Sequence, residues 1–550
     1  MSIGGAGRAR HLTEKQQILR SAGLVSFLTL LSRLLGYARD LALAILLGTS
    51  LAADAFVIAF RIPNLLRRLT AEGAMTGAFI PIFSQYRSQR PAEAWDFANR
   101  VFWTLAAVLT GVTLAGMLFA PGLVRLFTLL STEPGEWELA VLLTRIIFPY
   151  CTLIGLAALA SAALNTLGSF GLPASTPIFL NVAILGAAAA AYLTGYPEPA
   201  IALAVGVVAG GVLQLGVQVP GLWRRGMRFP WGFGFSHPGV QRVARLVLPA
   251  FAGVGIYQVN VLISTVFATS PWVPRGSVAA LYYADRVMEV ALGAYAISVA
   301  TVILPLMSRQ AADRNLEGMK RTLGFAFRNV GFIVIPASVG LIVLHEPIIR
   351  VLFQHAAFGS DSTALTARAL VYYALGLPAF AAVRLVVQAF YALEDTATPV
   401  RMAGVALVAN VVLCAVLVRP LQHAGLALAT SLASVVNFVS LYYLLRRRIG
   451  ALDEGAVVRS LFRTAGMAAV MGGLCWLLSG TLGLGASQPF ASLLLRFGLT
   501  LVLALALYGF LAWVLRAEEW REFRMLWQRG PNRTTEPASR AVVPTAAQDS

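Results

Sequence analysis

Several arginines of this sequence lie inside long apolar stretches, and they are the residues that most directly indicate chemistry. An arginine at the centre of a membrane-spanning helix costs roughly 2.5–3.5 kcal/mol, so each one needs a partner or a water-filled cavity. The first apolar stretch contains Arg33 and Arg39, and Asp40 follows directly. The charged residues within the second, eighth and tenth stretches are Asp54, Arg61, Arg67, Arg68, Glu72, Asp285, Arg286, Glu289 and Arg384.

These charges allow two interpretations. Arg39 with Asp40, and Arg286 with Glu289, are spaced for structural ion pairs, and arginines near helix ends can extend to the polar interface. However, positive charge without an evident partner concentrates in the first, second and eighth stretches. Such a cluster suits a ligand that carries phosphate, because the guanidinium fork matches phosphate oxygens and stays charged away from water. A cation exporter would need the opposite sign.

Residues for catalysis or metal binding are poorly arranged by comparison. The five histidines lie in loops or near the ends of apolar stretches without metal-ligand spacing, and the three cysteines lie singly in apolar segments. The sequence contains no glycine-rich phosphate loop and no nucleophile elbow. It therefore predicts neither an enzyme nor a metal site or cofactor, and favours transport without covalent chemistry.

The elements that must position these charges are apolar helices. Of the 550 residues, 58% are hydrophobic and only 12% are charged, and the mean hydropathy is +0.74, which excludes a soluble protein. The apolar runs are continuous rather than alternating, which excludes an outer-membrane barrel and predicts an all-α polytopic membrane protein. With about 20 residues per crossing, we expect about fourteen spans, at 22–47, 52–86, 98–127, 139–165, 172–194, 199–222, 241–269, 277–308, 322–353, 366–393, 399–418, 422–445, 459–482 and 489–515. The second span is long enough that we expect a bend or break at Ile62-Pro63-Asn64.

Loop charges predict the orientation of these spans. Basic residues gather in alternate connections: the N-terminal stretch, 87–100, 224–228, 309–321, 446–448 and the tail from Arg516. The only basic residues of the intervening connections are Arg275 and Arg419. The positive-inside rule therefore places the basic connections and both termini in the cytoplasm. The formal net charge of +18 is then explained by this topology and by contacts with anionic membrane lipids. It does not indicate binding of nucleic acid.

An internal repeat with an offset of about 224 residues relates the two parts of the chain. Three pairs of segments match in the same order: AFIPIFSQY at 78–86 with VILPLMSRQ at 302–310, PGLVRLF at 121–127 with PIIRVLF at 347–353, and Thr176-Pro177 with Thr398-Pro399. The repeated unit holds six spans. Because six is even, we expect two parallel six-helix lobes related by a pseudo-two-fold axis along the membrane normal, plus two extra C-terminal helices.

The predicted organisation follows from the spans, the loop charges and the repeat. It consists of a basic cytoplasmic N-terminus (1–21), an N-lobe (22–222), a cytoplasmic linker (223–240), a C-lobe (241–445), two further spans (446–515) and a cytoplasmic tail (516–550). The tail is rich in Pro, Thr, Ala and Arg after about residue 527, which predicts disorder there.

The charged segments also carry a family resemblance. SRLLGYARD at 32–40, the stretch from Asp54 to Tyr86 that includes NLLRRLTAEGA, and YYADRVMEVALGAYAISVATVILPLMS at 282–308 resemble the MurJ (MviN) family of bacterial lipid II flippases. That family belongs to the superfamily of multidrug and oligosaccharide-lipid exporters. The resemblance covers nearly the whole chain except the tail. It implies translocation of lipid II, the undecaprenyl-diphosphate-linked peptidoglycan precursor, from the inner to the outer leaflet of the cytoplasmic membrane, by a single chain.

The resemblance also implies which residues bind the substrate. The family's functional arginines match Arg33, Arg39, Arg67 and Arg286, and its functional acids match Asp54 and Glu72; Asn64 joins them by its position beside the expected break. Some members are thought to hold sodium with a carboxylate on the seventh span. The seventh span of this sequence has no Asp or Glu, which argues against a sodium site of that kind.

Three alternatives stay open beside this interpretation. A drug or cation antiporter of the same superfamily is disfavoured by the sign of the intramembrane charge. A flippase for another lipid-linked oligosaccharide is disfavoured by the NLLRRLTAEGA segment. A membrane scaffold that recruits cell-wall enzymes without transport would not need arginines within its spans.

Overall fold

The computed structural model describes residues 4–71, 74–132, 137–293, 295–485 and 489–521, and within these ranges the chain forms helices and connecting loops without strands. The helices are α1 (Gly4–Leu47), α2 (Leu51–Ala71), α3 (Ala74–Gln89), α4 (Pro91–Leu118), α5 (Ala120–Phe127), α6 (Glu138–Ile147), α7 (Tyr150–Thr166), α8 (Gly171–Thr194), α9 (Pro199–Trp223), α10 (Pro238–Ala268), α11 (Ser277–Gly293), α12 (Ala296–Ala312), α13 (Leu316–Val343), α14 (His345–Phe353), α15 (Ser360–Ala392), α16 (Ala397–Leu421), α17 (His423–Ile449), α18 (Glu454–Thr481) and α19 (Phe490–Val514). The predicted all-helical fold is confirmed for these residues. The tail predicted to be disordered lies outside them.

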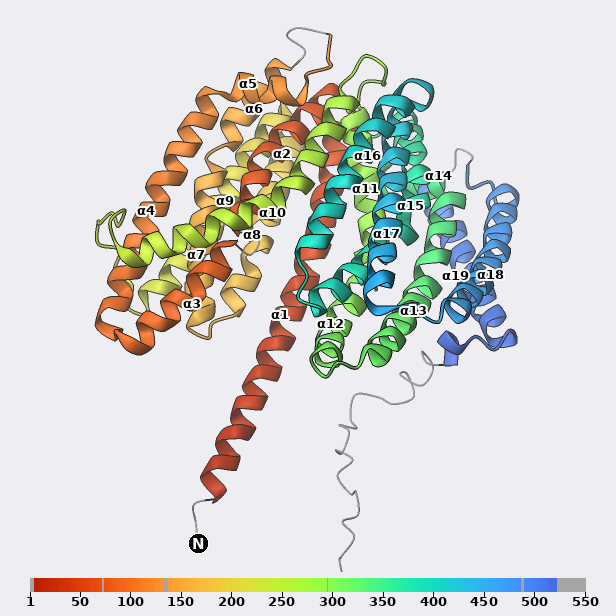
Figure 1. The fold of residues 1–550 in the computed structure, drawn as a ribbon. Helices are drawn as coiled ribbons and strands as arrows, with labels where there is room; N and C mark the ends of the chain where they lie inside the picture. Colours follow the sequence, from red (N-terminus) through yellow and green to blue (C-terminus); the bar gives the residue numbers. More distant parts are fainter. Residues whose placement is uncertain (1–3, 72–73, 133–136, 294, 486–488, 522–550) are drawn as a thin grey trace, which may run out of the picture.

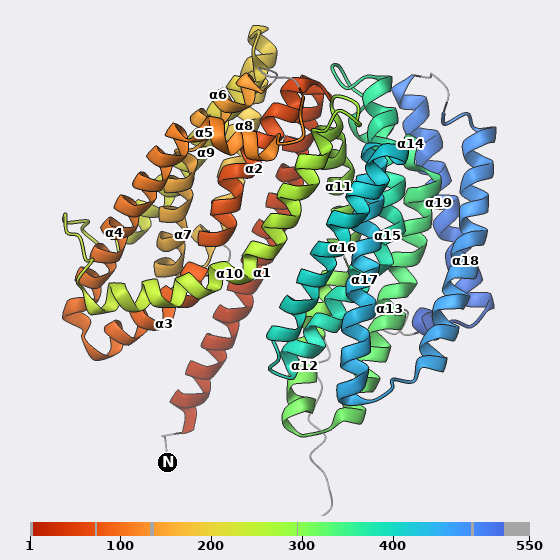
Figure 2. The same cartoon turned by 45° about the horizontal axis from the view of Figure 1, so that its top comes forward.

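The helices form two groups side by side (Figures 1 and 2). Helices α2 to α9 lie in one group, and α11 to α17 lie in the other, with α18 and α19 on its outer side against α13. Helix α1 packs against α8 of the first group and reaches α14 of the second. Helix α10 contacts α3 and α4 as well as α16 and α17, so it connects the two groups.

The predicted spans correspond to single helices or to pairs of consecutive helices. Ten helical segments of the described chain are long and apolar enough to cross a membrane, and α11 with α12 forms an eleventh candidate that is bent by 48°. The ranges predicted as the first, second and seventh spans hold α1, α2 with α3, and α10. The chain is therefore a multi-pass membrane protein, and the count of fourteen crossings stays a prediction.

The helix is not interrupted at Ile62-Pro63-Asn64, where we expected a bend or break in the second span. Helix α2 continues through Pro63. Proline removes one backbone hydrogen bond, but a transmembrane helix tolerates this loss where neighbouring helices cover it. Pro63 is buried here, and its carbonyl accepts a contact from the Cys151 thiol on α7 at 3.8 Å. Packing against α7 therefore outweighs the local preference.

The three repeated segment pairs fall on corresponding elements. Pro81 lies inside α3 and Pro305 inside α12. The second pair forms the short helices α5 and α14. The third pair lies near the beginnings of α8 and α16. Segments that match in sequence thus follow one another in the same order in the two halves of the chain.

The α1–α2 turn, residues 48–50, contacts the second group of helices at the end of the molecule opposite the N-terminus (Figure 1). Thr49 Oγ1 lies 2.8 Å from the hydroxyl of Ser362 on α15, and the backbone N–H of Ala357 donates to the carbonyl of Ile45 at 3.1 Å. A Cβ on Gly276, whose φ is +81°, would lie 1.8 Å from the Thr49 carbonyl oxygen. Only glycine permits this approach, so the two groups are in close contact at this end.

Candidate functional site

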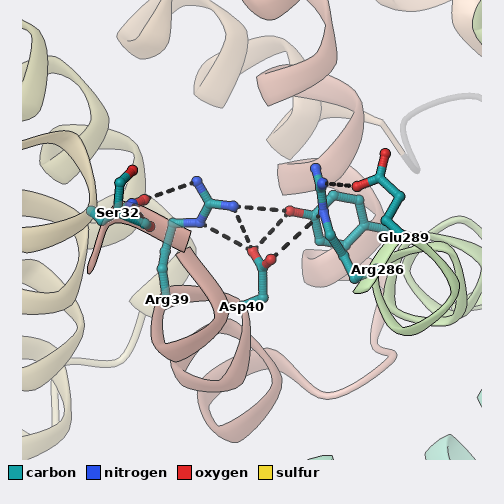
Figure 3. Close-up of polar contacts among 7 residues, drawn as sticks. Ser32, Arg39, Asp40, Arg286 and Glu289 are labelled. Carbon is teal, nitrogen blue, oxygen red and sulfur yellow. Dashed lines mark hydrogen bonds and ion pairs between the residues drawn. The ribbon is translucent and has the colours of Figure 1, made fainter. Parts of the chain in front are cut away.

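Asp40 is the centre of a polar cluster between α1, α8 and α11 (Figure 3). Its Oδ1 atom lies 2.7 Å from Nη2 of Arg39 and accepts the Tyr282 hydroxyl at 2.9 Å. Its Oδ2 atom lies 3.6 Å from Nε of Arg286. The Asp40 side chain is only 5% exposed, so one carboxylate in a nearly dry position faces two guanidinium groups.

The Arg39 guanidinium is fixed on both sides. In addition to its contact with Asp40, the Arg39 guanidinium donates from Nη1 to Oδ1 of Asn181 on α8 at 3.2 Å. The amide nitrogen of Asn181 in turn donates at 3.1 Å to the carbonyl of Ser32, which lies about two turns before Arg39 on α1. Asn181 therefore joins α8 to α1 and orients Arg39, whose side chain is 12% exposed.

The Arg286 guanidinium is held less completely. Its Nη1 atom pairs with Oε2 of Glu289 at 2.5 Å, and its Cζ atom lies 5.0 Å from the centre of the Tyr282 ring. The side chains of Arg286 and Glu289 are 31% and 40% exposed. Tyr282, Arg286 and Glu289 are four and three residues apart, so a helix brings them to one face. Arg286 is thus the guanidinium of the cluster with more freedom to meet a ligand.

That face of α11 is oriented by Asp54 of α2. The Asp54 carboxylate accepts the backbone N–H groups of Gly276 at 2.9 Å and of Ala279 at 2.7 Å, where α11 begins. A carboxylate at this position accepts hydrogen bonds from backbone amides that would otherwise be unpaired. Its negative charge also interacts favourably with the positive end of the helix dipole. Asp54 is 3% exposed, so these contacts place it in the structural support of α11.

Beside the cluster lies a partly open cavity between α1, α2, α10 and α11. Its polar and charged lining residues are Arg61, Asn64, Gln258, Tyr282, Asp285, Arg286 and Glu289. Arg61 donates from Nη1 to the hydroxyl of Thr265 on α10 at 2.6 Å. The cavity therefore combines guanidinium and amide donors with carboxylates, which suits a polar, charged ligand.

The structure brings only some of the predicted site residues together. Arg39 and Arg286 share Asp40, and Asn64 lines the same cavity as Arg286. Arg33 is exposed on α1, and among the described residues no hydrogen bond or ion pair joins it to the cluster. The side chain of Arg67 is not described, and Glu72 lies outside the described residues.

The expectation of positive charge without partners is wrong for the two arginines that are described best. Both Arg39 and Arg286 have a carboxylate within ion-pair distance, as the alternative interpretation expected. Burial explains this, because an isolated charge away from water is costly and a neighbouring carboxylate reduces that cost. Sequence reasoning missed Tyr282, Asn181 and Gln258 as site residues, and it named Arg61 among the charges within the spans without assigning it to the site. The signal for Asn181 was an amide within an otherwise apolar span.

The fold and the cavity together define a class of protein. Many apolar helices in two groups, with ionised side chains gathered at an internal cavity, are the features of a polytopic membrane transporter. Among the described residues, no group of three or more His, Cys, Asp or Glu side chains is placed to hold a metal ion. Comparisons with known proteins specify the class further.

The family described as lipid II flippase MurJ matches residues 43–495. A probable lipid II flippase MurJ of Vibrio cholerae is 36% identical over 519 residues, covering 88% of this chain and 97% of that protein. The lipid II flippase MurJ of Burkholderia cenocepacia is 35% identical over 510 residues, covering 90% and 97%. The chain belongs to the lipid II flippase MurJ family.

Solved structures agree with this assignment. A lipid II flippase MurJ in an inward closed conformation superposes with a TM-score of 0.75 at 25% identity, covering 90% of this chain and 99% of that one. An inward-facing multidrug resistance transporter of the MATE family superposes with a TM-score of 0.61 at 14% identity, covering 77% and 96%. The second likeness shows that the fold is shared with multidrug transporters. The resemblance found in the sequence is thus confirmed at the level of the family.

Proposed function

We propose that this protein translocates lipid II from the inner to the outer leaflet of the bacterial cytoplasmic membrane, as its relatives' names indicate for them. The observation that carries the proposal is the pair Arg39 and Arg286, which come from α1 and α11 and share one carboxylate beside a cavity. Guanidinium groups match the oxygens of a diphosphate, and they keep their charge in surroundings with little water. Nothing in this process requires covalent chemistry.

Binding of the diphosphate would proceed by exchange of anions. Arg286 is paired with Glu289, whose carboxylate is 40% exposed and can therefore be resolvated at low cost when phosphate oxygens replace it. Asp40 is 5% exposed and also holds Arg39 and Tyr282, so it stays in place and keeps the two arginines together. In this scheme Arg39, Asp40 and Tyr282 form the fixed part of the site, and Arg286 is its adjustable part.

Transport would follow from alternating access of two parallel lobes, 22–222 and 241–445, joined by the linker 223–240 and followed by the additional spans within 446–515. The places of the repeated pairs support this division, because α3 and α12, α5 and α14, and α8 and α16 correspond. The sugar-peptide head group of lipid II would occupy the cavity while the polyprenyl chain stays in the lipid. One chain suffices for this cycle.

Fourteen crossings with both termini in the cytoplasm complete the proposed topology. The N-terminal end of α1 and the junctions α3–α4, α12–α13 and α17–α18 lie toward the same end of the molecule (Figures 1 and 2). These are the connections that carry the basic residues, which favours their retention in the cytoplasm.

Alanine substitutions of Arg33, Arg39, Arg67 and Arg286 test the proposed binding site. We expect each to abolish complementation of a strain depleted of its own lipid II flippase while membrane abundance stays near normal. Lysine should restore growth only in part, because an ammonium group cannot present a fork to the diphosphate. Arg90 is a matched control, since its side chain is 65% exposed and pairs with an exposed Glu93.

The leaflet that holds accumulated lipid II distinguishes the proposed function from its rivals. Depletion of this protein should leave lipid II in the inner leaflet, and the Arg286→Ala variant should do the same. Growth of all four alanine variants would refute the arginine site. Normal exposure of lipid II outside depleted cells would refute the transport function itself, and would favour a different lipid-linked oligosaccharide or a drug as cargo.

A further inference from the structure

The connection between α9 and α10 exposes an unusual number of aromatic side chains. We call residues 223–237 the aromatic-basic linker. Its exposed fractions are 59% for Trp223, 77% for Trp231, 52% for Phe233 and 58% for Phe235. Exposed aromatic rings in one short loop are costly in water, so this loop has an apolar or interfacial surrounding.

The same linker is strongly basic. Arg224, Arg225 and Arg228 are all exposed. No Asp or Glu occurs between Glu198 and Asp285, so the sequence provides no nearby acid along the chain to neutralise them. Arg225 and Arg228 each donate one Nη1 group to a carbonyl of α9, at 2.9 Å, which leaves their other N–H groups available and orients both side chains.

The aromatic-basic linker is packed onto α4 in a defined way. The indole rings of Trp231 and Trp103 are stacked with their centres 4.1 Å apart and their planes 16° apart. The backbone N–H of Gly234 donates to the buried hydroxyl of Thr104 at 2.8 Å. A Cβ on Gly234 would lie 2.8 Å from Cβ of Arg100, so glycine is needed for this approach. The exposed rings are therefore displayed by a fixed backbone.

The position of Trp103 along α4 indicates how deep these rings lie relative to the membrane. Arg100 ends the polar first part of α4, and the apolar part begins at Val101, two residues before the Trp103 that stacks on Trp231. The rings thus lie where the polar and apolar parts of a candidate span meet. Tryptophan and arginine favour this boundary, because rings enter the acyl region while guanidinium groups reach the head groups.

We propose that the aromatic-basic linker binds the phosphate groups of anionic phospholipids in the leaflet at the basic end of the molecule. Arg224, Arg225 and Arg228 contact the head groups, and Trp231, Phe233 and Phe235 enter the boundary of the acyl region. The charge complementarity and the level of the rings both favour a lipid surface over a soluble partner. The binding site lies apart from the arginine cavity and does not depend on the proposed cargo.

The charge part of the proposal is tested by replacing all three arginines with glutamine. The variant R224Q/R225Q/R228Q and the wild type are purified from membranes that contain phosphatidylglycerol and phosphatidylcholine, and the retained lipids are measured by native mass spectrometry. We expect the preference for phosphatidylglycerol to fall about tenfold, because the attraction of each arginine to an anionic surface adds to the binding free energy. Binding of zwitterionic lipid should change little.

The matched control removes the same charge from a different basic run. In R446Q/R447Q/R448Q the lost guanidinium groups already have partners, with Arg446 near Glu454 at 3.2 Å and Arg448 near Asp395 at 2.6 Å. Arg447 lies over the ring of Tyr443 at 4.5 Å. This control should keep most of the phosphatidylglycerol preference. Equal losses in both triple variants, or no loss in either, would overturn the proposal.

The aromatic part is tested by the depth of the linker in vesicles. A Phe233→Cys variant is labelled with an environment-sensitive fluorophore; the three native cysteines are buried. In phosphatidylglycerol vesicles we expect blue-shifted emission that lipid-borne bromine quenches and aqueous iodide does not. Emission typical of water, with full quenching by iodide, would refute membrane insertion of the linker.

Discussion

Replacement of Asp40 by Asn is the sharpest test of how the arginine cluster is held. The variant keeps the size of the side chain but removes the negative charge that lies 2.7 Å from Arg39 and 3.6 Å from Arg286. The two guanidinium groups would then face each other without the shared carboxylate. The structure therefore predicts a loss of stability as well as a loss of transport.

The size of this loss follows from burial. Removing one partner of a buried ion pair costs about 3–5 kcal/mol, because the remaining charge is left away from water. Asp40 and Arg39 are 5% and 12% exposed, whereas Arg286 is 31% exposed and contributes less. We expect the free energy of unfolding to fall by about 3 kcal/mol. Glu289→Gln is the control, and its 40% exposed carboxylate should contribute less than about 1 kcal/mol.

The assay is equilibrium unfolding in detergent micelles, followed by tryptophan fluorescence and checked for reversibility. The double variant R39Q/D40N removes both partners and should be destabilised less than the sum of the single variants, with a coupling of about 1 kcal/mol or more. An Asp40→Asn variant that is as stable as Glu289→Gln would refute the reasoning. So would strict additivity of the two changes at Arg39 and Asp40.

Three further predictions concern the whole chain. Truncation after Trp527 should leave transport intact, because the removed segment lacks the apolar content needed to pack; loss of activity in a stably inserted truncation would contradict this. Reporter fusions should place both termini in the cytoplasm, and an outward tail after Arg516 would refute the topology. In vesicles with lipid II on the inner leaflet, collapsing a cytoplasm-negative potential should slow transport, since moving one negative charge outward through 100 mV releases about 2.3 kcal/mol. An unchanged rate, or an absolute need for ATP, would contradict this account.

The helices of this protein could be predicted because crossing a membrane requires about 20 consecutive apolar residues, a local property of the sequence. Where a helix is interrupted depends less on the local sequence. Pro63 lies within an uninterrupted α2 that packs on α7, whereas Pro121 stands at the start of α5, directly after the interruption at Phe119. The energy that decides such cases comes from neighbouring helices, which no short window of sequence contains.

The candidate site was likewise predictable only in part. The pairs Arg39 with Asp40 and Arg286 with Glu289 were predictable, since they are adjacent or three residues apart on one helix. The contact between Asp40 and Tyr282 joins residues 242 positions apart and depends on how α1 packs against α11. The cap that Asp54 provides for α11 likewise spans 222 positions. Sequence therefore indicated the charged residues of the site but not which of them share a partner.

The contact between Thr49 and Ser362 offers a chemical means of controlling the protein. Their hydroxyl oxygens are 2.8 Å apart, and the three native thiols are buried. A T49C/S362C variant therefore places two new thiols within reach of oxidation, so that a disulfide would fasten the α1–α2 turn to α15 and a reductant would release it. If the two groups of helices must separate at this end during transport, the oxidised protein is inactive and reduction restores it. Undiminished transport by the oxidised protein would show that this contact persists throughout the cycle.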